Sequence, residues 1–212
     1  AEDSRNVCLT LPRFLLRAPY GSQNEISEFD YEENAVEGDD FCWGNAAFAL
    51  ATRVVDSFAK YRWCPNIIGP KSGGAVTGLP SYVYDRDGKF FVAGPVEIPI
   101  SDRREYEFSN LGFAPLTLRK GTDNASFFSA NSIQKAKFFG SDAEAKQAEL
   151  NYKLGTQLPY LFVVTRLAHY LKVLQRENLG GWVSRGEIEA ELNRWIRSYV
   201  ADQENVPSAM RS

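Results

Sequence analysis

Helical and strand-like hydrophobic patterns alternate along this sequence, and no other feature limits its fold as strongly. In residues 44–62, apolar side chains recur every three or four positions, which predicts an amphipathic helix packed against a sheet or another helix. The residues of the predicted apolar stripe are Ala47, Leu50, Ala51, Val54, Val55 and Phe58. Residues 82–84 and 89–93 are β-prone and enclose the sequence Asp-Arg-Asp-Gly at residues 85–88, which is typical of a hairpin turn.

The same mixture continues in the second half of the chain. Ser101 is placed to cap a helix that runs to about Leu111, with Gly112 in the position that ends it. Residues 115–119 and 125–130 then flank a polar turn, which predicts a second hairpin. We therefore expect an α+β fold of mixed helices and short β-hairpins, with the order helix, hairpin, helix in the C-terminal part.

Three further helices are predicted. Residues 143–154 favour a solvated helix, and residues 159–175 favour a more apolar helix that tolerates Pro159 because it falls in the first turn. Ser184 and Glu187 have the spacing of a capping box, which marks the start of the last helix. The apolar residues on one face of that helix are Ile188, Leu192, Trp195, Ile196 and Tyr199.

Prolines and charges characterise the remaining segments. Residues 7–20 are apolar but interrupted by prolines, so we expect a buried segment that is extended or irregular. Residues 21–40 contain eight Asp or Glu residues and are expected to form an exposed loop.

Two prolines separate the first hairpin from the next helix, so we predict two domains, residues 1–96 and residues 97–212. Residues after Val200 are polar and are expected to fray.

The charge balance and the cysteines exclude several classes of protein. The chain has 24 Lys and Arg residues against 27 Asp and Glu residues, so it lacks the excess basic charge with which proteins bind nucleic acid. Its three cysteines are widely spaced and form no Cys-x-x-Cys pair, which fits neither a disulfide framework nor a zinc site. A reducing cytoplasm is the expected compartment.

The apolar runs and the first residues of the sequence bear on membrane insertion and on where the chain begins. No run approaches the roughly 20 consecutive apolar residues of a membrane helix, so we expect no direct membrane insertion. The first residues show neither an initiator Met nor the pattern of a secretory signal. We therefore expect the chain to begin inside a longer protein.

The single histidine, His169, raises the question of catalysis. It could act as a general base for Cys42, and a cysteine hydrolase built on these two residues is the enzyme alternative. A catalytic pair needs a third, orienting group, and the sequence specifies none. One histidine also supplies too few ligands for a metal site. We expect an interior, hydrogen-bonded histidine, a chain that is not an enzyme, and no catalytic, cofactor-binding or metal-binding residues.

Glycines around Lys71 and Ser72 invite comparison with a phosphate-binding loop. In such a loop a glycine stands directly before the lysine, whereas this chain has Pro70 there and its glycines follow. A tight turn is therefore expected over residues 69–74. The acidic residues of 25–40 likewise lack the residue order of a calcium-binding loop.

Four charged residues, Asp102, Arg103, Arg104 and Glu105, fall within one predicted helical turn. As a solvated face they would contribute little, because exposed ion pairs are worth about 0–1 kcal/mol. As an assembly contact they would fix which surfaces meet, since arginine can bind a carboxylate at two points. The sequence alone favours the solvated face and leaves the assembly contact open.

Nine short stretches, in order along nearly the whole chain, resemble the large sheath subunit of type VI secretion systems, the TssC or VipB family. The stretches are residues 10–21, 43–45, 63–64, 73–76, 78–80, 100–105, 111–113, 158–160 and 168–172. The resemblance implies that residues 1–96 are the C-terminal part of a tail-sheath domain. It also implies that residues 97–212 are similar to a phage baseplate wedge (gpW-like) fold of helices around a hairpin.

The resemblance implies a mechanical role in the bacterial cytoplasm. The expected partners are a small sheath subunit of the TssB or VipA type, other copies of the chain, an inner tube of hexameric rings, and a baseplate. The baseplate and a membrane complex would anchor the sheath at the inner membrane, and an unfoldase ATPase would recycle the contracted sheath. From the density of charge beside a helix start, our own hypothesis is that Arg103 and Arg104 help to hold a contact between subunits or domains.

Two departures from the family limit these expectations. Compared with the family, we expect the chain to lack the long N-terminal region, which includes the segment that the unfoldase recognises, and to end before the C-terminal extension that adds strands to neighbouring subunits. We therefore expect the chain to fold without contracting or recruiting the unfoldase. A phage-type tail sheath or baseplate component, which shares these mechanics, is the other open alternative.

Overall fold

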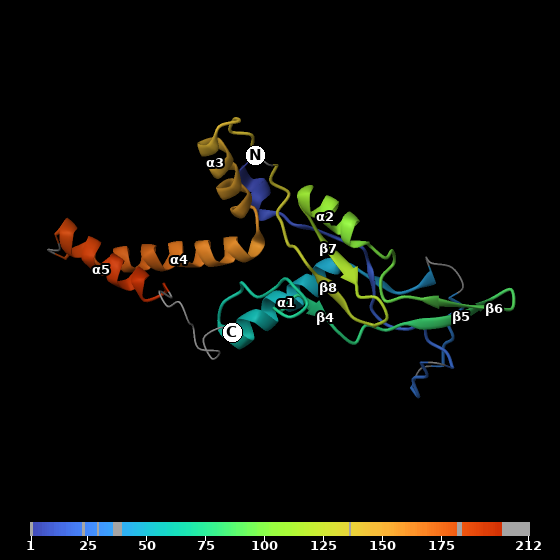
Figure 1. Cartoon of the computed structure of the whole chain (residues 1–212). Coiled ribbons are helices and arrows are strands. Elements are labelled where there is room, and N and C mark those ends of the chain that lie inside the picture. The colour runs from blue at the N-terminus through green and yellow to red at the C-terminus, as the bar shows by residue number, and fades with distance from the viewer. Residues whose placement is uncertain are drawn as a thin grey trace. The chain divides into compact units, whose positions relative to one another are not determined.

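A computed structural model describes residues 2–22, 24–28, 30–35, 40–135, 137–181 and 184–200 (Figure 1). Its internal contacts divide the chain into two compact units, unit 1 (Ala1–Leu161) and unit 2 (Phe162–Ser212), which we describe separately. No described helix is both long enough and apolar enough to cross a membrane. The expectation that residues after Val200 fray lies outside the described residues.

A four-stranded mixed sheet forms the centre of unit 1. Its strands are β1 (Leu9–Leu11), β7 (Phe113–Leu118), β8 (Ala125–Phe127) and β4 (Ala75–Val76), in the order β1-β7-β8-β4. β1 runs parallel to β7, whereas the β7–β8 and β8–β4 pairs are antiparallel. Ala114, Leu116, Ala125 and Phe127 are fully buried in it. The β7–β8 pair confirms the second predicted hairpin.

Helix α1 (Ala46–Tyr61) packs against β1 and β4. The Asn45 side chain caps it by accepting a hydrogen bond from the Ala47 N–H at 2.8 Å, which confirms the predicted helix. The predicted direction of its apolar stripe is wrong. The helix buries Ala46, Ala49, Leu50 and Ser57, so Leu50 is the only stripe residue that is fully buried. The helix is apolar on two faces, and hydrophobic periodicity did not distinguish the inner face from the outer one.

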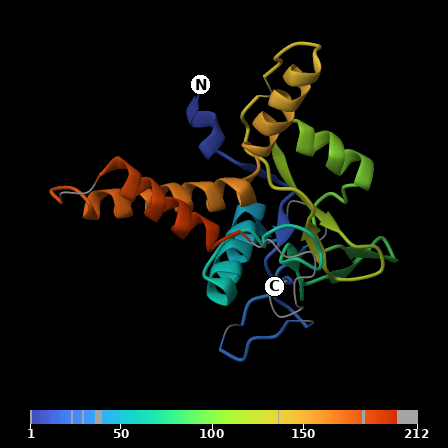
Figure 2. The same ribbon diagram turned by 60° about the vertical axis from the view of Figure 1, so that its left-hand side comes forward.

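The β-hairpin of β5 (Tyr82–Arg86) and β6 (Lys89–Ala93) projects from the rest of unit 1 (Figures 1 and 2). Asp87 and Gly88 have φ angles of 55° and 75°, as the turn of a two-residue hairpin requires, which confirms the prediction from residues 85–88. At its base, Phe41 meets the rings of Tyr82 and Tyr84 edge to face at 6.0 and 5.7 Å. These contacts join the hairpin to a small second core.

Part of the N-terminal segment also packs into this second core. β2 (Phe14–Leu15) pairs with β3 (Trp43–Gly44), and both residues of β2 are buried. The segment 7–20 is therefore extended in part, as expected, but Leu9 and Leu16 are 45% and 51% exposed, so its expected burial holds for only part of it. A short 3-10 helix, η1 (Glu2–Asn6), precedes it.

The remaining helices of unit 1 are α2 (Asp102–Asn110) and α3 (Ala143–Leu154), which precede and follow the β7–β8 hairpin in sequence. The order helix, hairpin, helix is thus confirmed. Gly112 ends the first of these helices with a φ angle of 91°, as the sequence predicts. The domain boundary predicted at residues 96–97 falls inside unit 1, where β7 and β8 pair with β1 and β4 across it. That boundary stays a prediction.

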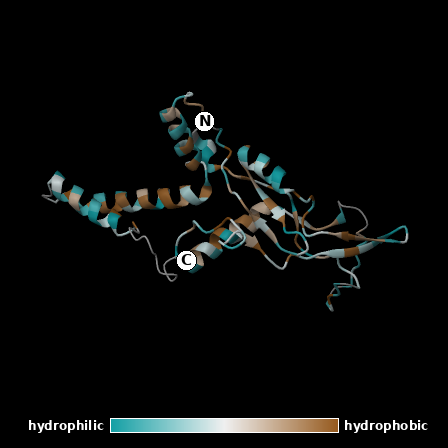
Figure 3. Cartoon of the chain, in the orientation of Figure 1, coloured by the Kyte–Doolittle hydropathy of each residue, from teal (hydrophilic) through white to brown (hydrophobic). Residues whose placement is uncertain are grey.

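Unit 2 consists of most of α4 (Leu158–Glu177) and all of α5 (Arg185–Arg197). The capping box is confirmed, because the Ser184 hydroxyl accepts from the Glu187 N–H and the Glu187 carboxylate accepts from the Ser184 N–H. Trp195 joins the two helices by an edge-to-face contact with Tyr170 at 6.2 Å. Hydrophobic residues recur along α4 (Figure 3), yet no residue of α5 is fully buried.

Candidate assembly interface

The four charged residues singled out in the sequence form the first turn of α2. Asp102, Arg103 and Arg104 are exposed, whereas Glu105 is half-buried and accepts a hydrogen bond from the Ser129 hydroxyl at 2.5 Å. The carboxylates of Asp102 and Glu105 lie at the positive end of the helix dipole, which stabilises their negative charges. The turn therefore exposes three charged side chains to solvent, and the fourth, Glu105, anchors the helix through its hydrogen bond with Ser129.

The arginines of this turn have little to bind among the described residues. The Arg103 side chain donates to Glu107 at 3.2 Å, but the two side chains are 90% and 51% exposed, and an ion pair that exposed contributes little to stability. Within the ranges that the structure describes, neither Asp102 nor Arg104 has an ion-pair partner. These charges fit a solvated face and are also free to bind a neighbouring molecule.

An apolar pocket of about 320 Å³ lies beside α2, and sequence reasoning did not find it. Its lining residues include Leu11, Ala46, Ile98, Ile100 and Phe108. They come from four separate segments, so no local pattern could have predicted the pocket. At its rim, Arg13 donates to both carboxylate oxygens of Glu97, at 2.9 and 2.6 Å. These hydrogen bonds lower the pKa of Glu97.

A second ion pair anchors the acidic loop. Arg17 donates to both carboxylate oxygens of Glu33, at 2.6 and 2.7 Å, and the Tyr20 N–H donates to the same carboxylate at 3.0 Å. The guanidinium also lies over the Tyr20 ring, 3.8 Å from its centroid. The hydrogen bond from Arg17 is the main cause that lowers the pKa of Glu33 from 4.5 to about 2.

The Arg17–Glu33 pair predicts a loss of stability in acid. Because the pKa of Glu33 is lower in the folded chain, the stabilisation is complete above pH 4.5 and is lost as the pH falls towards 2. The two side chains are 32% and 23% exposed, so we expect Glu33→Gln to lower the free energy of unfolding by only about 1 kcal/mol at pH 7. Urea unfolding at pH 7 and at pH 2.5 measures the difference, which should nearly vanish in acid.

Glu32→Gln is the matched control for this change. Glu32 is exposed in the same loop, so its replacement should leave the free energy of unfolding nearly unchanged at both pH values. An equal loss in the two variants, or a loss in Glu33→Gln that persists at pH 2.5, would contradict the role given to the Arg17 contact.

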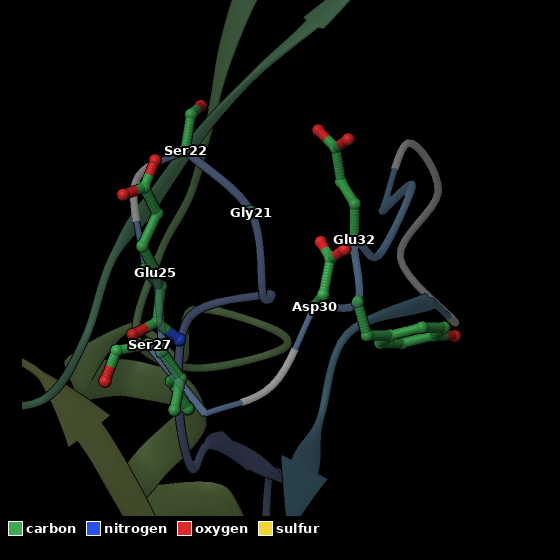
Figure 4. Close-up of a pocket in the computed structure, with 9 residues that line it drawn as sticks. Gly21, Ser22, Glu25, Ser27, Asp30 and Glu32 are labelled. Atoms are coloured by element: carbon green, nitrogen blue, oxygen red, sulfur yellow. The ribbon is translucent and has the colours of Figure 1, made fainter.

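The described part of the acidic loop surrounds an open hollow of about 720 Å³ (Figure 4). Glu25 lies on one side of it, and Asp30 and Glu32 lie on the other. Across the described residues, no group of three or more His, Cys, Asp or Glu side chains is arranged to hold a metal ion. The loop is exposed, as the sequence predicts, with Ala35 turned into the small core around Phe41.

Comparison with known families assigns this chain to a class of protein. The family model described as "EvpB/VC_A0108, tail sheath N-terminal domain" (VipB) matches residues 1–134. The chain belongs to the VipB family of tail sheath proteins. A second VipB model, described as the tail sheath gpW/gp25-like domain, matches residues 147–212. The expected resemblance is therefore confirmed, and so is the α+β class with a C-terminal gpW-like part.

A curated relative agrees with the VipB assignment. The type VI secretion system sheath protein TssC1 of Pseudomonas aeruginosa is 42% identical over 205 residues, which cover 94% of this chain and 40% of the relative. The chain thus spans less than half the length of this sheath protein. The β7–β8 hairpin lies within the first matched domain, and α4 and α5 lie within the second.

The residues of the enzyme alternative lie in different units of this VipB chain. Cys42 is half-buried in unit 1, where its carbonyl accepts from the Leu16 N–H at 3.0 Å. His169 is exposed on α4 in unit 2, so the expectation of an interior histidine is wrong. Leu161 is the only fully buried residue of α4, and the apolar neighbours of His169 in sequence do not enclose it. Burial raises the pKa of the Cys8 thiol to about 11, which disfavours its reactive form.

The glycine-rich segment is a structural turn, as expected. The Gly69 N–H donates to the Phe127 carbonyl at 2.7 Å, and the Phe127 N–H donates to the Gly74 carbonyl at 3.0 Å. The Gly74 N–H closes the turn by donating to the Gly69 carbonyl at 2.8 Å. The backbone groups of this turn are thus used to extend the central sheet.

Proposed function

We propose that the chain is a structural part of the large subunit of a type VI contractile sheath. In this proposal it assembles with a small sheath subunit of the TssB or VipA type, and with other copies of the large subunit, around an inner tube of hexameric rings. Contraction of the sheath then propels the tube. The observation that carries the proposal is the tandem match of two tail sheath models to residues 1–134 and 147–212.

A sheath subunit needs matched surfaces, and it makes or breaks no bond in a substrate. Two packings of the same subunits that differ in interface energy can supply the stroke. The exposed charges of α2 and the apolar pocket beside it fit such a surface. We therefore propose that the chain is not an enzyme and acts in the bacterial cytoplasm. The further partners of the whole sheath would be the baseplate, through which a membrane complex anchors it, and an unfoldase ATPase that recycles it after contraction.

A chimera tests the proposal in the setting of a whole sheath protein. The matched 205 residues of P. aeruginosa TssC1 are replaced by those of this chain, and the chimera is produced together with the small sheath subunit. Electron microscopy should show sheath-like tubes. A chimera that is soluble, gives the circular dichroism of a folded protein and never forms tubes would overturn the proposal.

The α2 turn gives a residue-level prediction within this test. We expect Arg103→Glu combined with Arg104→Glu to reduce tube formation at least about tenfold, because reversed charges repel the carboxylates that these arginines would bind. Tubes are counted by negative-stain microscopy at equal protein concentration. Both residues are exposed, so the free energy of unfolding should change by no more than about 0.5 kcal/mol.

Arg119→Glu combined with Lys120→Glu is the control for the change in net charge. These two residues are also consecutive, basic and exposed, but they lie in the turn between β7 and β8. The control chimera should form tubes normally. Normal tubes from the Arg103 and Arg104 chimera would remove the proposed contact and leave the sheath assignment in place.

A further inference from the structure

The outer face of α1 is an apolar surface that nothing within the described chain covers fully. We define it as Ala47, Phe48, Ala51, Val55 and Phe58, all of which are exposed. Phe48 and Val55 are 69% and 67% exposed. At 100° per residue these positions span an arc of about 100° on the helix, as wide as the stripe with which a helix normally faces a core.

The opposite face of α1 already packs on the central sheet. Its buried residues are Ala46, Ala49, Leu50 and Ser57. The Ser57 hydroxyl donates to the Trp63 carbonyl at 2.9 Å. The helix is therefore apolar towards the sheet and apolar on its outer face. A helix with two apolar faces is typical of one buried between two layers of a domain.

The charged residues of α1 lie on and beside its inner face, away from the outer arc. Asp56 pairs with Lys60 at 2.8 Å and with Arg53 at 3.8 Å, and Arg53 also donates to the Ala75 carbonyl of β4 at 2.8 Å. No charged residue falls on the outer arc between Ala47 and Phe58. Surfaces that proteins use for reversible contacts carry polar rims, whereas domain interiors are depleted of charge. The outer face has the composition of an interior.

The comparison with TssC1 indicates what covers this face. The 205 matched residues are 40% of that sheath protein, so the larger part of its polypeptide lies outside the match. We propose that the outer face of α1 packs against this other part of the large sheath subunit and closes the core of its sheath domain. The inference rests on the family assignment and on the exposed face, and it does not require the sheath to contract.

Cysteine labelling tests the inference in the full-length chimera. Val55→Cys is introduced both into the isolated chain and into the chimera, which is kept monomeric and without the small subunit. Tryptic cleavage at Arg53 and Lys60 isolates the new thiol from the three native cysteines for mass spectrometry. Maleimide labelling should be at least about tenfold slower in the chimera, because packing excludes the reagent.

Phe90→Cys on the β5–β6 hairpin is the matched control, since Phe90 is 79% exposed and lies away from α1 in sequence. It should label at the same rate in both proteins. Equal labelling of Val55→Cys in the chain and the monomeric chimera would overturn the inference. So would protection that arises only when the small subunit is added, or only when the isolated chain dimerises, because each result would assign the face to a different occupant.

A stability measurement gives a second, independent readout. Phe48→Glu should lower the melting temperature of the monomeric chimera and leave that of the isolated chain nearly unchanged, because the face is buried only in the chimera. An unchanged melting temperature in both proteins would overturn the inference. Neither measurement involves tubes, so its failure is distinct from a failure of the proposed sheath function.

Discussion

Replacing Phe127 by alanine is expected to lower the free energy of unfolding of unit 1 by about 3–5 kcal/mol. Among the described residues Phe127 is the largest side chain with no exposed surface, and it lies opposite Leu116 in the β7–β8 pair. Its removal loses the buried ring and leaves a cavity, because β8 is held on both sides by β7 and β4 and cannot collapse into the space. Urea unfolding followed by far-ultraviolet circular dichroism measures the loss.

Phe90→Ala is the matched control for this substitution. The same side chain is removed from another β-strand, but Phe90 is 79% exposed on β6, so the change in free energy should stay within about 0.5 kcal/mol. Similar losses in the two variants would show that the central sheet is not the main core of unit 1. A small loss in both would show that the sheet can close around the cavity.

Local chemistry explains which parts of the fold could be predicted. The turn at residues 85–88 and the capping box at Ser184 each depend on residues that are close in sequence, and both are confirmed. The charged turn of α2 was predicted for the same reason. Short-range signals of this kind need no information about what the element packs against.

Long-range packing explains what could not be predicted. β4 is a strand of two residues, and its pairing with β8 across 49 positions leaves no periodic pattern in sequence. Helix α1 is apolar on two faces, so the choice of the inner face depends on the sheet beneath it. The pocket beside α2 combines residues from four segments, and the bond from Ser129 that turns Glu105 inward also depends on the tertiary fold.

Gly73 should be the most sensitive glycine of the turn that supports β8. Its φ angle of 102° is strained for any L-residue, and an added Cβ atom would lie 2.1 Å from the carbonyl oxygen of Asn66. Because that contact is with backbone, Gly73→Ala must move the turn whose neighbouring Gly74 bonds to Phe127. We expect a loss of about 3 kcal/mol or more in the free energy of unfolding.

Gly78→Ala separates the two causes of this loss. Gly78 also has a positive φ angle, 67°, but an added Cβ atom would meet nothing within 4 Å. Alanine at this position should therefore cost only the conformational strain, about 1 kcal/mol. The difference between the two variants, measured by urea unfolding, isolates the collision with Asn66. If the two losses were equal, the backbone angle alone would govern this turn, and its close contact with residue 66 would contribute nothing to the stability of unit 1.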